Sequence, residues 1–222
     1  MLGNPVQSAR IFNSRGVDEL IFLDIFASKQ KRKINYKIVK DVIKECFMPV
    51  GIGGGINTVE DIYEILKIGA DKVVIKTEAL QNPKFIEDAA NYYGSQCISI
   101  SIDAYRNSDN NYMVYSETDV EISVIDFAKQ MQDFGAGEII LNSVDNDGMM
   151  QGFDLELYNY IESEINLPIV ITGGGGNLNH FEDLFKNTRC EAVGSASIFS
   201  FSQYTPLDIK ATLSNLGKPV RM

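Results

Sequence analysis

A glycine cluster between a short apolar run and a helical segment occurs twice in this chain, and it constrains the fold more than any other feature. Residues 49–55 read PVGIGGG and residues 168–174 read PIVITGG, at an offset of 119 residues. At the same offset, GVDELIFLD at 16–24 matches GAGEIILNS at 135–143. The chain is therefore predicted to contain two copies of one structural unit.

Strands and helices are expected to alternate along the whole chain. Apolar runs that predict strands occur at 19–23, 49–52, 72–75, 97–102, 138–141, 168–171 and 191–193. Such alternation predicts a parallel sheet covered by helices, either an open doubly wound sheet or a closed (β/α)8 TIM barrel. The duplication, with four βα units per copy, favours an α/β barrel built from two half-barrels. We expect a single domain over residues 1–222.

Several helix starts are also predicted. A capping side chain before proline is typical of a first helical turn, because that turn does not use the N–H that proline lacks. Such pairs occur at 4–5, 82–83 and 205–206. Capping-box spacing is found at 57–60 and 179–182. The basic block KQKRK at 29–33 is expected to be a solvated loop.

Composition excludes several classes of protein. A net charge of −10 argues against a nucleic-acid partner, which requires a basic face. No run of 18 apolar residues and no signal-peptide core is present, so we expect a soluble, cytoplasmic protein without a membrane partner. Cys46, Cys97 and Cys190 lack metal-site spacing and are expected to be buried and reduced. His180, the only histidine, is expected to be structural, and neither a metal nor a cofactor is predicted.

The glycine clusters also predict phosphate binding. Backbone N–H groups at glycine turns and helix N-termini hold anions without basic side chains. A single glycine run is more often only a tight turn, but two runs in register favour the binding interpretation. Each is followed by a strand that ends near a hydroxyl residue at a helix start, Thr77 in KVVIKTEAL and Ser197 in AVGSASIF. We therefore expect two phosphate sites and a bisphosphorylated ligand across the barrel mouth.

Carboxylates at strand ends are candidates for acid–base chemistry. Asp103 closes the run CISISID, and no helix is expected to begin beside it, so it is the strongest catalytic candidate. Asp24 closes IFLD, and Asp145 and Asp147 follow the strand that ends at Ser143. Asp24 and Asp145 could equally cap the next helix.

The chain resembles the HisF family, the cyclase subunits of imidazole glycerol phosphate synthase. The motifs that carry the resemblance span essentially the whole chain and are, in order, FLDIFAS, VGIGGGI, GADKVVIKTEAL, GSQCISISIDAYR, GAGEIILNSVDNDG, ITGGGG and ASIFSF. The resemblance implies a barrel that receives ammonia through its interior from a HisH-like glutaminase, as a heterodimer. It also implies a lyase of histidine biosynthesis that converts a bisphosphorylated ribulosyl aminoimidazole carboxamide nucleotide to imidazole glycerol phosphate and aminoimidazole carboxamide ribotide.

The resemblance further implies roles for individual residues. Asp103 matches one of two catalytic aspartates, and Asp24 is counted among the substrate-binding residues. One phosphate would be held by Gly55, Lys76 and Thr77. The other phosphate would be held by Asp147, Gly148, Gly174, Ala196 and Ser197. A charged gate at the ammonia entrance, at the opposite end of the barrel, would be formed by Glu19, Lys72 and Glu138.

Four departures from the family pattern bear on the substrate. Lys76 stands where the family has asparagine, Tyr105 where it has lysine, and Met149 where it has threonine. Only Met1 and Leu2 precede GNPVQSARIF, where the first strand and the other catalytic aspartate are expected, so we expect that strand to be missing and a longer form to be more stable and active. Two alternatives stay open: a HisF-like subunit that uses ammonia to form amidino sugars for surface polysaccharides, and an inactive barrel that binds a glutaminase.

Overall fold

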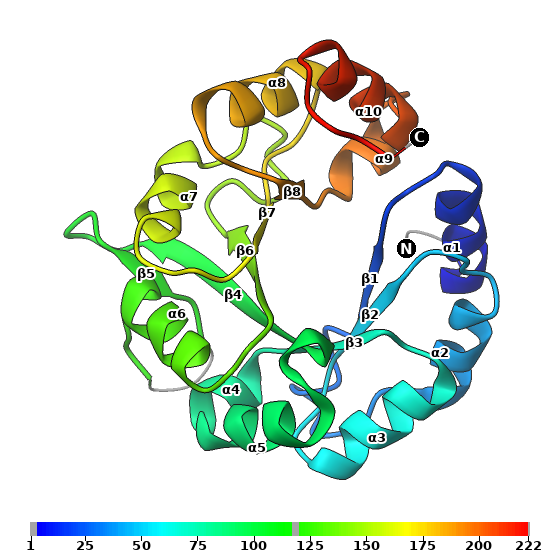
Figure 1. Cartoon of the computed structure of the whole chain (residues 1–222), viewed down its shortest axis with the longest axis vertical. Helices are drawn as coiled ribbons and strands as arrows, with labels where there is room; N and C mark the ends of the chain where they lie inside the picture. The colour runs from blue at the N-terminus through cyan, green and yellow to red at the C-terminus, as the bar shows by residue number, and fades with distance from the viewer. Residues whose placement is uncertain (1–3, 117–119, 222) are drawn as a thin grey trace. The chain divides into compact units, whose positions relative to one another are not determined.

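The computed structural model describes residues 4–116 and 120–221 (Figure 1). It divides into two compact units. The first unit comprises Met1–Ile100 and Phe134–Gly137, and the second comprises Ser101–Asp133 and Glu138–Met222. The expected single domain stays a prediction, and Met1 and Leu2, where the expectation of a missing strand falls, lie outside the described residues.

In the first unit, parallel strands follow one another in chain order. They are β1 (Leu20–Leu23), β2 (Val50–Gly53), β3 (Lys72–Ile75) and the beginning of β4 (Ile98–Arg106). The intervening helices are α1 (Pro5–Ser14), α2 (Tyr36–Ile43), α3 (Val59–Ile68), α4 (Thr77–Gln81) and α5 (Lys84–Tyr93), followed by a short 3-10 turn, Ser95–Cys97. Helices α1, α2 and α3 lie along one side of these strands in Figure 1. Apolar side chains such as Ile52 and Ile62 are completely buried and supply the core of the unit.

The second unit repeats this arrangement and adds a hairpin. The end of β4 pairs in antiparallel fashion with β5 (Tyr112–Val114), and three parallel strands follow: β6 (Glu138–Ser143), β7 (Ile169–Thr172) and β8 (Ala192–Val193). The helices are α6 (Val124–Asp133), α7 (Leu155–Glu162), α8 (Leu178–Asn187), α9 (Ser197–Phe201) and α10 (Pro206–Asn215). Large buried side chains such as Phe127, Met131 and Phe181 form its core.

The duplication predicted from the sequence is present in the elements themselves. Helices α2 and α7 begin at residues 36 and 155, β2 and β7 at 50 and 169, and α3 and α8 at 59 and 178, and each pair has the same length and an offset of 119. The strand order is β1-β2-β3-β4-β6-β7-β8, with β5 attached to β4. This sequential parallel order with intervening helices is that of the (β/α)8 class, and the predicted fold class is confirmed.

Helix starts were predicted with mixed success. Asn4 and Thr205 are N-caps followed by proline, as expected, and Thr205 forms a full capping box with Asp208. The helix start predicted at 82–83 was wrong, because α5 begins only at Lys84 and has no side-chain cap. Both predicted capping boxes were also wrong. The residues with extended backbone directly before the first turns of α3 and α8 are Thr58 and Asn177, and their side chains accept the helix N–H groups instead.

The cysteines and the membrane prediction can also be compared with the structure. Cys190 is buried, and burial raises the pKa of its thiol to about 12. Cys46 and Cys97 are only half-buried, so the expectation that all three are buried was wrong; all three are free thiols. In the described part of the chain, no helix is both long and apolar enough to cross a membrane.

Candidate functional site

The first glycine cluster is shaped by the loop that follows β1. Gly54 and Gly55 have φ angles of +122° and +66°, which favour glycine. A Cβ atom on Gly54 would lie 2.5 Å from the carbonyl oxygen of Asp24, and one on Gly55 would lie 2.5 Å from that of Arg32. The Gly55 N–H donates a hydrogen bond of 3.3 Å to the Ser28 hydroxyl. Glycine is therefore required here for close packing of two loops.

The other two residues of the first predicted phosphate site lie beside this cluster. The register of β2 and β3 pairs Gly53 with Val74, so Lys76 follows at the level of Gly55. Thr77 is the first residue of α4, and both Lys76 and Thr77 are half-buried. Gly55, Lys76 and Thr77 are thus brought together at the carboxyl ends of two neighbouring strands, where barrel enzymes carry their sites.

Asp24 anchors the loop after β1. Its two oxygens accept hydrogen bonds of 2.7 and 3.0 Å from the Arg32 guanidinium, and Oδ1 also accepts one of 3.2 Å from the Phe26 N–H. The hydrogen bonds from Arg32 hold the pKa of Asp24 below its usual range. Asp24 does not cap the next helix, because Asn35 occupies that position. A charged pair that the sequence analysis did not foresee therefore stands next to Gly54.

A second ion pair fixes the end of the same loop. The carboxylate of Asp61, on α3, is only 2% exposed, and it accepts contacts of 2.6 Å from Lys33 Nζ and 3.1 Å from the Tyr36 hydroxyl. Burial opposes the charged form of Asp61, but the hydrogen bonds from Lys33, Thr58, the Asn57 N–H and Tyr36 outweigh it and lower the pKa. Burial and Asp61 raise the pKa of Tyr36 to about 12, so its hydroxyl remains a donor. The block 29–33 is thus exposed but anchored at Arg32 and Lys33.

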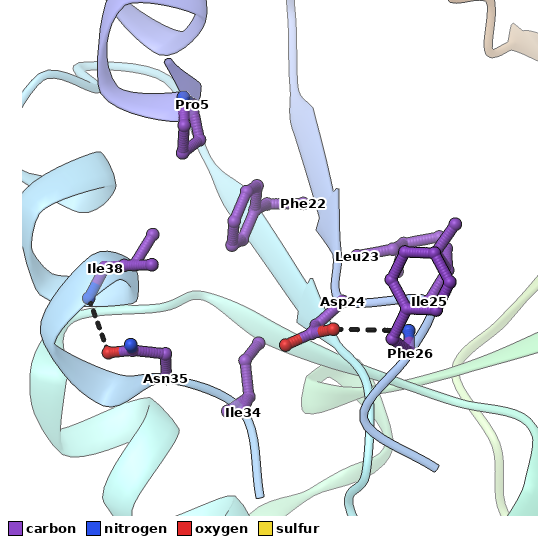
Figure 2. Close-up of a pocket in the computed structure, with 9 residues that line it drawn as sticks. All are labelled: Pro5, Phe22, Leu23, Asp24, Ile25, Phe26, Ile34, Asn35 and Ile38. Atoms are coloured by element: carbon purple, nitrogen blue, oxygen red, sulfur yellow. Dashed lines mark hydrogen bonds between the residues drawn. The ribbon is translucent and has the colours of Figure 1, made fainter. Parts of the chain in front are cut away.

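A pocket of about 540 Å³ lies beside Asp24 in the first unit (Figure 2). Its lining is mainly apolar and comes from α1, β1, the loop after β1 and the start of α2. The lining residues are Pro5, Phe22, Leu23, Asp24, Ile25, Phe26, Ile34, Asn35 and Ile38. Gly55 and Thr77 are not among these described lining residues. The pocket is therefore distinct from the predicted phosphate site, although Asp24 lines the pocket and packs against Gly54, the neighbour of Gly55.

The second glycine cluster is covered by the loop that follows β6. Gly173 and Gly174 have φ angles of +88° and +104°. The Gly152 N–H donates a hydrogen bond of 2.9 Å to the Gly174 carbonyl, and Asn146 Nδ2 donates one of 2.8 Å to the Gly152 carbonyl. A Cβ atom on Gly174 would collide with the Gly152 carbonyl oxygen. Backbone packing of two loops again requires glycine.

The remaining residues of the second predicted site lie in this loop and at the end of β8. Asp147 donates its N–H to the Ser143 carbonyl over 2.9 Å, and Gly148 has a φ of +75° with open space around its Cα. Ser197 begins α9, directly after the exposed Ala196. The register pairs Ile171 with Val193, so Gly174 and Ala196 follow at one level. The predicted residues therefore cluster at the carboxyl ends of β6, β7 and β8.

Asp103 lies on a polar rim that the sequence analysis did not identify. Asn142 Nδ2 donates a hydrogen bond of 3.3 Å to Asp103 Oδ1, and the Thr172 hydroxyl lies 3.1 Å from Asn142 Oδ1. These three half-buried residues come from β4, β6 and β7. The expectation that Asp103 closes its strand was wrong, because β4 continues to Arg106 through its pairing with β5.

The hairpin formed by β4 and β5 is tied to the loop after β6. The Arg106 N–H donates to Asp145 Oδ2 over 3.0 Å, and its guanidinium contacts Glu156 at 2.6 Å and the Tyr112 ring at 4.2 Å. The Tyr112 hydroxyl donates to Asp154, the N-cap of α7, and burial together with this bond raises the pKa of Tyr112. Asp145 is therefore a loop anchor, not a helix cap.

The predicted gate residues stand at the opposite strand ends. Lys72 Nζ lies 3.0 Å from Glu19 Oε1. Lys72 is the first residue of β3, and Glu19 directly precedes β1. Glu138, in the second unit, is the first residue of β6. The expected structural role of His180 agrees with its contacts, since its Nδ1 accepts the Gly176 N–H over 3.2 Å.

Comparison with known proteins places the chain in a family. The family model described as histidine biosynthesis protein matches residues 1–205, and the chain belongs to this family. Among curated relatives, the imidazole glycerol phosphate synthase subunit HisF of Bacillus cereus strain AH187 is 40% identical over 224 residues, covering 100% of this chain and 89% of the relative. The protein of the same name from Bacillus cereus strain Q1 is 39% identical over the same shares of both chains.

Proposed function

We propose that this chain is the cyclase subunit of an imidazole glycerol phosphate synthase in the cytoplasm. It would use ammonia to convert the bisphosphorylated ribulosyl aminoimidazole carboxamide nucleotide to imidazole glycerol phosphate and aminoimidazole carboxamide ribotide. The observation that carries the proposal is the recurrence, in a member of this family, of a glycine turn at the end of β2 and again at the end of β7. In each unit the next strand, β3 or β8, is followed by a helix that begins with a hydroxyl residue, Thr77 or Ser197.

The two turns support a substrate with two phosphates. In the first unit, a phosphate would take the N–H of Gly55, the hydroxyl of Thr77 and the charge of Lys76. In the second unit, the other phosphate would be held by Asp147, Gly148, Gly174, Ala196 and Ser197. Backbone N–H groups suit this task because they supply partial positive charge at fixed positions and need no side-chain ordering.

Asp103 is the proposed general acid–base residue. Through Asn142 it is connected to Thr172, which directly precedes the second glycine turn, and a positioned carboxylate can exchange protons with a reacting group. Turnover should be measured with the purified chain, an ammonium salt and the bisphosphorylated nucleotide, with both products followed. Absence of both products from a folded wild-type chain that binds the substrate would overturn the catalytic proposal and favour the inactive, glutaminase-binding alternative.

A soak with inorganic phosphate or sulfate tests the two sites independently of turnover. We expect anions beside Gly55 and Thr77 and beside Gly174 and Ser197. Anions found only on lysine-rich surface loops would remove the basis for a bisphosphorylated substrate.

The variant Lys76→Asn tests the amidino-sugar alternative. If restoring the family's asparagine raises turnover of the nucleotide more than about tenfold, or one step of about 1.4 kcal/mol, the native lysine serves a different phosphorylated substrate.

The proposed partner is a HisH-like glutaminase. The curated relatives are named as subunits, and ammonia released into water at neutral pH is mostly protonated, so a sheltered passage keeps it nucleophilic. Glu19, Lys72 and Glu138 are the proposed gate residues. Lys72→Glu should weaken co-purification with the glutaminase and reduce glutamine-dependent turnover, while turnover with added ammonium salt is retained. Equal losses with both nitrogen sources would contradict the gate assignment.

A further inference from the structure

A hydrogen-bond chain runs across three neighbouring strands, β4, β6 and β7, in the second unit. The Thr172 hydroxyl contacts Asn142 Oδ1 at 3.1 Å, and Asn142 Nδ2 contacts Asp103 Oδ1 at 3.3 Å. The alternation of side chains along a strand places these residues on one face of the sheet. Asn142 and Thr172 are direct partners in the register of β6 and β7. The contact between Asn142 and Thr172 therefore follows from the strand register, and all three residues lie on strands and not in a flexible loop.

The partners on either side define how the Asn142 amide is oriented. An ionised carboxylate only accepts hydrogen bonds, so Asp103 is matched by the NH₂ end of the amide. The amide oxygen then faces Thr172, whose hydroxyl can donate to it; this hydroxyl also lies 3.3 Å from the Leu141 carbonyl. The opposite amide orientation would set two oxygens against each other at the Asp103 contact. Asp103 thus selects the amide orientation, and the Thr172 hydroxyl is compatible with it.

We propose that Asn142 is a positioning residue for Asp103, and that Thr172 positions Asn142. The proposal rests on the proposed function, in which Asp103 exchanges protons with the substrate. A carboxylate on a half-buried rim can rotate about its side-chain bonds, and a fixed amide donor reduces this freedom before the substrate binds. Such preorganisation acts on the rate of the chemical step more than on substrate affinity.

Four substitutions of similar size test the chain of contacts. Asn142→Leu removes the amide, Asn142→Asp replaces the donor with a second carboxylate, Thr172→Val removes the hydroxyl, and Thr172→Ser retains it. With ammonium salt as nitrogen source, we expect kcat to fall on the order of 10- to 100-fold for Asn142→Leu and further for Asn142→Asp, while KM changes less than about threefold. Thr172→Val should lower kcat by roughly three- to tenfold, and Thr172→Ser should restore it to within about twofold.

Crystal structures of the wild type and of Asn142→Leu supply a readout that does not depend on turnover. We expect the Asp103 carboxylate to rotate, or to lose defined density, in the variant. An unchanged Asp103 orientation, a loss in KM without a loss in kcat, or equal effects of Thr172→Val and Thr172→Ser would overturn the proposal. If the wild type itself gave no turnover, the proposed function would fail, and the orientation of Asp103 would still decide the role of Asn142.

Discussion

The two units share one plan of secondary structure but differ in the side chains at their strand ends. At the offset of 119 residues that relates β1 and β2 to β6 and β7, Leu23 corresponds to Asn142, and Gly53 corresponds to Thr172. The first unit therefore presents apolar or small residues where the second unit presents a polar pair bonded to Asp103. The glycine turns are present in both copies of the duplicated scaffold, whereas the candidate acid–base group and its polar neighbours lie in the second.

The loops that cover the two glycine turns also differ. In the first unit, the loop after β1 is held by charged side chains, through the pairs Asp24–Arg32 and Lys33–Asp61. In the second unit, the loop after β6 is held by its backbone, since the Gly152 N–H bonds to the Gly174 carbonyl. Close backbone packing is thus common to both turns, and the first unit adds anchoring by charged pairs whose carboxylates are buried or half-buried. Substitutions should separate the contribution of the charged pairs from that of backbone packing.

The largest expected effect concerns the chemistry assigned to the second unit. Asp103→Asn keeps the shape of the side chain but removes its ability to exchange a proton, so kcat should fall on the order of 10² to 10⁴-fold. The matched control is Asp133→Asn, on the exposed end of α6 in the same unit, which should change kcat less than about twofold. Steady-state kinetics with ammonium salt measures both variants. Comparable losses in the two would show that the division of roles between the units is mistaken.

The next effect distinguishes the glycines of the second unit. Gly174→Ala places a methyl group against the Gly152 carbonyl and should lower the free energy of unfolding by about 3 kcal/mol. Gly148→Ala has the same unfavourable sign of φ but open space around it, so only the backbone cost of about 1 kcal/mol is expected. Denaturant unfolding of both variants measures the difference. If Gly148→Ala were as destabilising as Gly174→Ala, backbone strain and not loop packing would explain the cluster.

Much of the fold could be predicted because its strands are short, buried and apolar. The predicted range 72–75 coincides with β3, and the other parallel strands were placed to within a few residues. The hairpin strand β5 was missed because it has only three residues. Its attachment depends on distant partners, such as the Tyr112 bond to Asp154, which no local pattern specifies. The type of the other elements could be predicted from local periodicity, whereas the hairpin depends on tertiary contacts that local periodicity does not report.

The candidate site could be predicted only in part, for a similar reason. Gly55, Thr77, Gly174 and Ser197 stand out because glycine turns and helix starts leave local signals. Asn142 leaves none, because a polar residue in a strand acquires meaning only when its neighbours across the sheet are known. Asp61 reads as an ordinary solvated helix residue in the sequence, and its burial against Lys33 is set by the path of another loop.

A smaller effect tests the electrostatic anchoring in the first unit. Asp61→Asn removes a buried carboxylate that accepts several hydrogen bonds, and it should lower the free energy of unfolding at pH 7 by about 2 kcal/mol. Because the pKa of Asp61 is lowered by folding, its contribution is present above the unfolded pKa and is lost as the pH falls through the folded value. Chemical unfolding of both proteins between pH 7 and acid should therefore show the difference shrinking below about pH 4. A pH-independent difference would mean that the hydrogen-bond acceptors of Asp61, and not its charge, anchor the loop.

The smallest expected effect concerns the amino-terminal ends of the strands, where the two units can be compared. At the offset of 119 residues, Lys72 corresponds to Glu191, and Gly51 corresponds to Val170. Lys72 reaches Glu19 across β2 because Gly51 has no side chain; a Cβ atom there would lie 3.2 Å from the Lys72 stem. Lys72→Met should therefore lower the free energy of unfolding by about 1 kcal/mol, since this lysine is largely buried. Glu191→Lys should change it by less than about 0.5 kcal/mol, because Val170 pairs with Ala192 and not with Glu191, so the register of the first unit is not repeated. Double-mutant cycles of Lys72→Met with Glu19→Gln, and of Glu191→Lys with Glu138→Gln, measure the two coupling energies. Equal coupling in both units would show that strand position alone creates the pair, and that the glycine between its members has no part in it.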